Sequence, residues 1–117
     1  MDPTELSARH CIKCEPGTPH LDAEEIKTLA PQVPGWEVEE AGGHPVLVRR
    51  FKFKGFMPGV ELVDRIAAIA EQEGHHPDVC LGWGYVTVQL WTHAAGGLTE
   101  NDFILASKVD QAESSKS

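Results

Sequence analysis

Residues 78–91 read DVCLGWGYVTVQLW, and this stretch decides the fold. From residue 85 onward the pattern alternates as a half-buried strand does, with one face formed by Val86, Val88 and Leu90 and the other by Tyr85, Thr87, Gln89 and Trp91. Gly82 and Gly84 indicate a turn or bulge, so residues 78–83 are expected to form the preceding strand. The stretch therefore predicts an antiparallel hairpin with one face that needs covering.

A second hairpin is expected upstream. Residues 36–40 alternate apolar and polar side chains, and residues 46–53 have strand character. Gly42 and Gly43 lie between them and permit a tight turn at low cost. Each hairpin presents a face that a helix can cover.

Helical patterns flank both hairpins. The first helix begins near Asp22, which can form a capping box with Glu25, and it ends at Pro31 and Pro34 after an apolar stripe of Ile26, Leu29 and Ala30. The second starts at Pro58 and is expected to bury Val60, Val63, Ile66, Ala67 and Ala70. Gly74 is well suited to end it in a left-handed conformation.

The third helix is expected to follow Thr99, a suitable cap with Asp102 three residues later, and to run through Phe103, Ile104 and Val109. The element order is then α-β-β-α-β-β-α. This order predicts an α+β fold, a four-stranded antiparallel sheet with three helices packed on one face. We expect one domain over residues 21–112, a polar N-terminal arm over 1–20 and a disordered tail over 113–117.

The composition narrows the class of function. The chain has 18 acids, 10 bases and a net charge of −8, which argues against direct binding of nucleic acid. The one basic stretch, residues 49–54, alternates with apolar residues and is interpreted as the solvated face of a strand. No apolar run is long enough for a membrane span, the N-terminus lacks the pattern of a secretory signal, and a cytoplasmic location is expected.

Cys11 and Cys14 leave three alternatives open. A Cys-x-x-Cys pair can supply half of a zinc site, form a redox pair, or consist of incidental thiols in an arm. His10, His20 and Cys80 could complete a zinc site, but no spacing in the sequence requires it.

The candidate chemistry is concentrated in His75, His76 and His93. Pro77 forces His76 into an extended conformation, so the two neighbouring histidines are expected to point in opposite directions. This geometry disfavours a chelating pair and favours proton transfer by separate imidazoles. A metal site of the three histidines, with Asp102 as a further candidate ligand, is the alternative.

Asp102 has two interpretations. Its carboxylate could accept a ring N–H of His93 and hold that imidazole in one tautomer. An acid in the first turn of a helix is also stabilised by the helix dipole alone.

Taken together, Glu71-x-x-x-His75-His76-Pro77, the aromatic Tyr85, His93 and the stretch Leu98-Thr99-Glu100-Asn101-Asp102 resemble the pterin-4a-carbinolamine dehydratases. The resemblance runs from about residue 22 to 111. It implies three helices on a four-stranded sheet, and an enzyme that removes water from 4a-hydroxytetrahydrobiopterin to give quinonoid dihydropterin, without a metal or other cofactor. It also implies active-site roles for the three histidines and supporting roles for Glu71, Pro77 and Asp102.

Within that resemblance we expect His76 and His93 to share the acid–base work and His75 to hold the substrate hydroxyl. Val79 stands where some relatives carry a large aromatic residue. The alternative function is a non-catalytic scaffold, either a dimerisation cofactor or an assembly chaperone. The face formed by Tyr85, Thr87, Gln89 and Trp91 would lack a helix, so a homodimer or homotetramer is expected.

Overall fold

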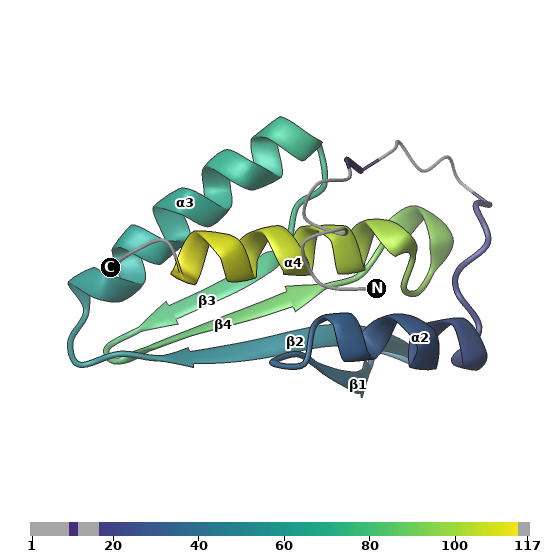
Figure 1. Cartoon of the computed structure of the whole chain (residues 1–117), viewed down its shortest axis with the longest axis horizontal. Helices are drawn as coiled ribbons and strands as arrows, with labels where there is room; N and C mark the ends of the chain where they lie inside the picture. The colour runs from purple at the N-terminus through teal and green to yellow at the C-terminus, as the bar shows by residue number, and fades with distance from the viewer. Residues whose placement is uncertain (1–9, 12–16, 115–117) are drawn as a thin grey trace.

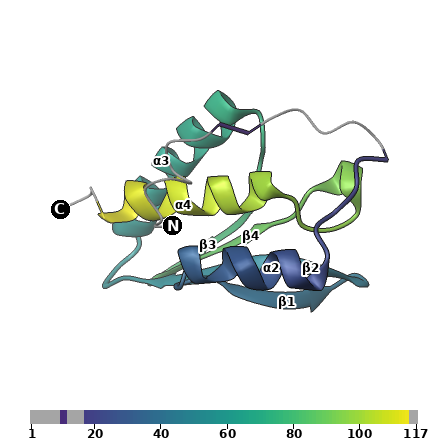
Figure 2. The same cartoon turned by 45° about the vertical axis from the view of Figure 1, so that its right-hand side comes forward.

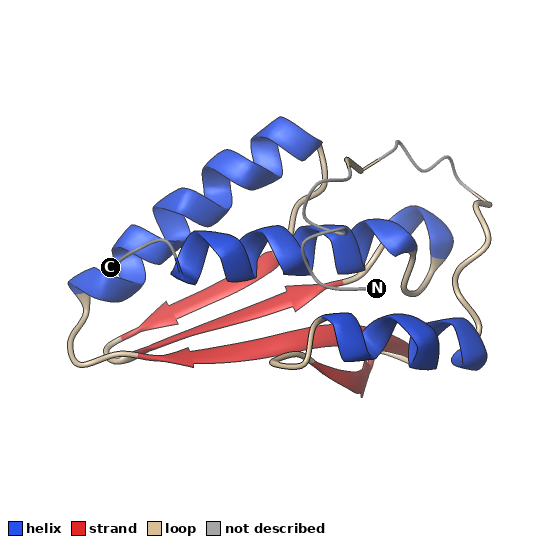
Figure 3. Cartoon of the chain, viewed as in Figure 1, coloured by secondary structure: helices blue, strands red, loops and turns tan. Residues whose placement is uncertain are grey.

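The computed structural model describes residues 10–11 and 17–114 of the 117-residue chain. Within these residues the main elements follow in the order α2 (Ala23–Leu29), β1 (Glu37–Ala41), β2 (His44–Lys52), α3 (Met57–Glu73), β3 (Asp78–Gly82), β4 (Tyr85–Leu90) and α4 (Glu100–Ser114) (Figure 3). Short 3-10 helices occupy Ala30–Gln32 and His93–Ala95. The predicted order α-β-β-α-β-β-α is confirmed.

The four strands form one antiparallel sheet in the order β1-β2-β4-β3. The two hairpins join through β2 and β4, where Leu47 lies opposite Leu90 and Phe51 opposite Val86. All three helices cover the same face of the sheet (Figures 1 and 2). The predicted fold class is therefore confirmed.

Local sequence signals set the ends of these elements. Asp22 accepts the backbone N–H of Glu25, and the Glu25 carboxylate accepts the N–H of Asp22, which completes the expected capping box of α2. Gly42 and Gly43 have φ values of 62° and 86°, and they form the turn between β1 and β2. The first hairpin thus depends on a backbone shape that glycine adopts without strain.

The core lies between the sheet and the helices. Val86, Val88 and Leu90 of β4 are fully buried there, as the alternation predicted. At the centre of the helical layer, α4 runs between α3 and α2 (Figure 1). Because it has neighbours on several sides, α4 buries seven successive positions, residues 101–107, together with Val109.

The predicted buried face of α3 was partly wrong. The buried positions are Gly59, Leu62, Ile66 and Ala70, whereas Val60 and Val63 are half-buried and Ala67 is exposed. Gly59 explains the shift, because a Cβ there would lie 2.8 Å from Leu81 Cδ1 and 3.1 Å from Val86 Cγ2. The helix approaches the sheet closely at this glycine, and that contact sets which of its faces is buried.

At the other end of the chain, α4 continues through Ser114. The helix therefore includes Glu113 and Ser114, which the sequence assigned to a disordered tail. Among the described residues, no helix is long and apolar enough to cross a membrane.

Candidate active site

One cleft of about 740 Å³ lies beyond the ends of α3 and β4. Two chain segments and one residue of α4 line it, and its walls are Glu73, Gly74, His75, His76, Pro77, Asp78, Trp91, Thr92, His93, Ala94 and Asn101. The cleft thus brings together all three histidines that the sequence singled out, although 17 positions separate the first two from the third.

The connection between α3 and β3 sets the directions of His75 and His76. Gly74 ends α3 with φ of 66°, in the left-handed conformation that the sequence predicted. Pro77 then starts the extended path into β3. Consequently the side chain of His75 turns inward and is 13% exposed, while that of His76 turns outward and is 59% exposed.

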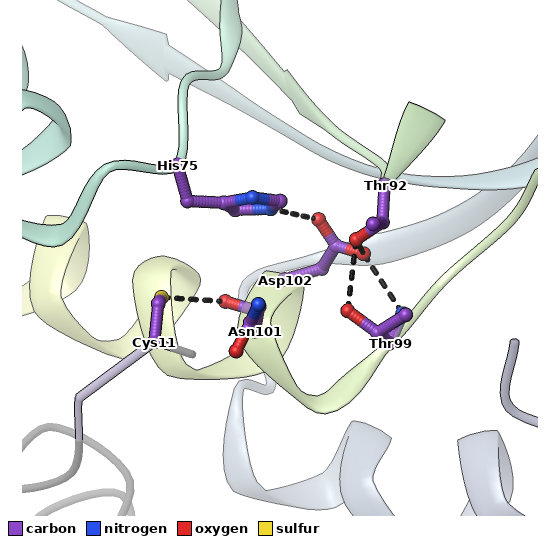
Figure 4. A network of polar contacts seen from close by, with 6 residues as sticks. All are labelled: Cys11, His75, Thr92, Thr99, Asn101 and Asp102. Atoms are coloured by element: carbon purple, nitrogen blue, oxygen red, sulfur yellow. Dashed lines mark hydrogen bonds and ion pairs between the residues drawn. The ribbon is translucent and has the colours of Figure 1, made fainter. Parts of the chain in front are cut away.

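His75 contacts a buried carboxylate. Its Nε2–H donates to Asp102 Oδ1 over 2.6 Å, and the Asp102 side chain has no exposed surface. The other carboxylate oxygen, Oδ2, accepts the hydroxyl of Thr92 and the backbone N–H of Thr99, each at 2.9 Å (Figure 4). Three donors therefore satisfy a carboxylate that would otherwise be costly to bury.

The hydroxyl of Thr99 extends this network by donating to Thr92 Oγ1 over 2.8 Å. Thr92 follows β4, and Thr99 directly precedes α4. Both interpretations of Asp102 therefore hold in part. It accepts the amide at the start of α4, and it also holds an imidazole.

That imidazole is not the expected one. The sequence analysis paired Asp102 with His93, but the structure pairs it with His75, 27 residues away. Asp102 faces inward from the first turn of α4, toward the end of α3. His93 is the exposed residue of the 3-10 helix that follows β4, and its ring stacks on Trp91 instead.

His76 has its own carboxylate partner. Its Nε2–H donates to Glu71 Oε2 over 2.6 Å, and the side chain of Glu71 is 77% exposed. Such an exposed pair contributes little to folding stability. It does orient the ring and fix which nitrogen carries the proton. The site therefore holds two histidine–carboxylate pairs, one buried and one exposed.

The sequence analysis missed the contribution of Glu73, whose carboxylate is only 3% exposed at the edge of the cleft. It accepts the backbone N–H of Cys11 and the Nδ1–H of His10, both at 2.8 Å, and it lies 3.6 Å from Lys108 Nζ. Burial raises the pKa of Glu73, but these donors outweigh burial and lower the pKa below its ordinary value. No sequence spacing predicts a contact that spans 63 residues.

Cys11 is the cysteine of the Cys11/Cys14 pair that the structure describes. The Cys11 thiol donates to the carbonyl oxygen of Asn101 over 3.6 Å, so this part of the arm packs beside the cleft (Figure 4). Cys14 lies outside the described residues. Among residues 10–11 and 17–114, no three His, Cys, Asp or Glu side chains are arranged to hold a metal ion.

Comparison with known proteins gives the family. The model of the pterin 4 alpha carbinolamine dehydratase family matches residues 19–112, which is most of the chain. The chain belongs to this family. Among its relatives is a protein of Rubrobacter xylanophilus that bears the name of a pterin-4-alpha-carbinolamine dehydratase. The two are 43% identical over 108 residues, which cover 92% of this chain and 98% of the relative.

Solved structures of the pterin dehydratase type share the fold. A protein described as a transcriptional coactivator/pterin dehydratase from Brucella melitensis matches with a TM-score of 0.72 and 30% identity, over 80% of this chain and 98% of that one. A pterin dehydratase-like protein described as a RuBisCO assembly factor in the alpha-carboxysome matches with a TM-score of 0.56 and 28% identity, over 68% and 89% of the two chains.

Proposed function

We propose that this chain is a cytoplasmic enzyme that removes water from 4a-hydroxytetrahydrobiopterin by histidine general acid–base catalysis, and so takes part in tetrahydrobiopterin recycling. One observation carries the proposal. A single cleft gathers His75, His76 and His93, and carboxylates orient the first two of these rings. Membership of a dehydratase family supports the reaction type.

The reaction needs two proton transfers. The bond between C4a and the hydroxyl oxygen breaks as that oxygen gains a proton and leaves as water. The proton on N5 departs, and its electron pair forms the N5–C4a double bond of quinonoid dihydropterin. Only protons and one water molecule move, so the step requires neither an oxidant nor a metal, and no cofactor is part of the proposal.

His76 and His93 are proposed to carry these protons. Both rings are exposed on the wall of the cleft, where they can exchange protons with solvent after each turnover. Each positioned acid or base contributes about 100- to 10,000-fold in rate. Glu71 would hold His76 in the tautomer whose free nitrogen, Nδ1, is available to substrate.

His75 is proposed to bind the departing hydroxyl rather than to exchange protons with solvent. Its Nε2–H is committed to the buried Asp102, which leaves Nδ1 as the nitrogen available to substrate. The carboxylate fixes this tautomer and the orientation of the ring, so that Nδ1 can accept the O–H of the substrate. Pro77 supports the arrangement by keeping the connection extended.

A scaffold role is the second candidate. The solved relatives include proteins described as a coactivator and as an assembly factor. The described helices all lie on the sheet face opposite Tyr85, Thr87 and Gln89 (Figure 1). We propose a homodimer or homotetramer that uses this uncovered side. Trp91, which was expected on the same face, is covered in part by stacking imidazoles.

A stopped-flow assay separates the two candidates. Purified protein is mixed with chemically generated 4a-hydroxytetrahydrobiopterin, and the formation of quinonoid dihydropterin is compared with the spontaneous rate. If the chain is the proposed enzyme, wild type should accelerate the reaction and His20→Ala should do so equally, because His20 is exposed and does not line the cleft. A folded protein that gives no acceleration would contradict the enzyme and favour the scaffold.

A further inference from the structure

Three aromatic rings form a continuous stack beside the cleft. The indole of Trp91 lies between two imidazoles, with its centroid 3.9 Å from that of His44 and 3.7 Å from that of His93. The planes are tilted by only 27° and 25°. Trp91 and His93 line the cleft, whereas His44 lies outside its walls, at the start of β2.

The first hairpin holds the His44 ring in place. Its Nδ1–H donates to the carbonyl oxygen of Pro45 over 3.1 Å. The ring also lies beside Gly42, where an added Cβ would be 3.5 Å from Nε2. His44 is half-buried and is therefore an ordered support on which the indole can rest.

Among the residues that the structure describes, no hydrogen bond of comparable kind holds the His93 ring. It is exposed, it lies in a three-residue 3-10 helix, and Asp102 has its oxygens occupied by other donors. An exposed imidazole loses rotamer freedom when it is fixed, so a stacking partner must hold it. Trp91 supplies that partner by stacking on the imidazole, and His44 covers the opposite face of the same indole.

We infer that His44 is a positioning residue for His93 and acts on it through Trp91. The inference rests on the proposed function in its kinetic part, because it assigns His93 to proton transfer. Loss of one stacked pair should lower kcat about two- to tenfold, the rate equivalent of a typical aromatic contact. The Michaelis constant should stay unchanged, since His44 does not line the cleft.

The test compares His44→Ala with His44→Phe, which keeps a flat ring over the indole. The ¹H NMR signals of the His93 ring, assigned by their loss in His93→Gln, report stacking because the indole shifts them upfield. We expect His44→Ala to move these signals toward those of free histidine and to lower kcat. His44→Phe should restore both, and His20→Ala should change neither.

Unchanged His93 signals in His44→Ala would overturn the inference, as would a His44→Phe variant with kcat as low as that of His44→Ala. The NMR comparison needs no substrate. A protein that shows the predicted shifts but no dehydratase activity would therefore contradict the proposed function while leaving the coupling between His44 and His93 in place.

Discussion

Asp102 is the residue on which the site depends most. It joins the ring of His75 to the hydroxyl of Thr92 and to the amide of Thr99, and so it connects the end of α3, the end of β4 and the start of α4. A buried carboxylate with three donors fixes all of these groups at once. One side chain thus serves both the fold and the proposed chemistry.

We expect Asp102→Asn to slow dehydration by about 100-fold or more, because the amide oxygen would accept from Thr92 and Thr99 while its NH2 faces His75 Nε2 and forces that ring into the opposite tautomer. The free energy of unfolding should fall by about 1–3 kcal/mol, since the NH2 of asparagine would face His75 Nε2, a nitrogen that donates to the wild-type carboxylate. Stopped-flow kinetics and urea unfolding measure the two effects.

Thr92→Val is the matched control, because it removes one donor to Asp102 and leaves the contact with His75 in place. This variant should lose stability with only a small change in rate. An Asp102→Asn enzyme with the wild-type kcat would contradict the role given to the buried pair.

At this scale the sequence could predict the residue types but not their pairing. The step from Gly74 to Pro77 set the opposite directions of His75 and His76 through local backbone rules. The partner of Asp102 depends instead on how α3 and α4 pack, which no local rule supplies. The contacts of Glu73 with His10 and Cys11 were missed for the same reason.

At the scale of elements, the C-terminal end of α3 sets the position of His75, the next residue after Gly74. Gly74 has φ of 66°, and nothing lies within 4 Å of where its Cβ would be. A substitution there meets no steric clash, so any loss of stability comes from backbone strain. Substitutions at Gly74 therefore test the left-handed conformation at the end of α3 without a change in side-chain packing.

Gly74→Ala should lower the free energy of unfolding by about 1–2 kcal/mol, the cost of a left-handed conformation for a residue with a Cβ. Gly74→Asn should lose less, because asparagine tolerates this conformation. Denaturant unfolding of both variants gives the comparison. Equal stabilities for all three proteins would contradict the assigned role of the helix end.

The elements themselves were well predicted where a pattern is local. The alternation in β4, the capping box of α2 and the glycine turn after β1 each specify one short segment. The buried face of α3 was not, because Val63 and Ala67 fit a helical stripe as well as Leu62 does. Close approach of the sheet at Gly59 decides between these faces, and it exists only in the folded protein.

For the whole molecule, Glu73 joins the N-terminal arm to the body of the fold. Its pKa lies below the ordinary value of 4.5 in the folded protein, so its stabilising effect is complete above that pH. The effect is lost as the pH falls through the lower folded value. Acidification below about pH 4.5 should therefore release this link between the arm and α3.

We expect Glu73→Gln to be less stable than wild type at pH 7, and the difference to shrink as the pH falls below 4.5. Urea unfolding at several pH values measures this. Glu61→Gln, at an exposed position of the same helix, is the control and should differ little from wild type at any pH. A stability difference for Glu73→Gln that does not depend on pH would contradict the assignment.

The uncovered side of the sheet leads to a prediction of assembly. We expect a dimer or tetramer by light scattering at micromolar concentration, because exposed Tyr85 and its neighbours form a face that none of the described helices covers. Tyr85→Lys should shift the mass toward the monomer by placing charge on that face. A strictly monomeric wild-type protein would contradict this proposal without affecting the site within one chain.

The central claim is that histidines in this one cleft dehydrate the hydroxypterin, and the most direct measurement is stopped-flow kinetics of wild type beside His76→Ala/His93→Ala. Both side chains are exposed, so the double variant should keep the wild-type melting temperature. The account predicts clear acceleration by wild type and a loss of at least about 100-fold in the variant. Near wild-type rates in a folded double variant would contradict it.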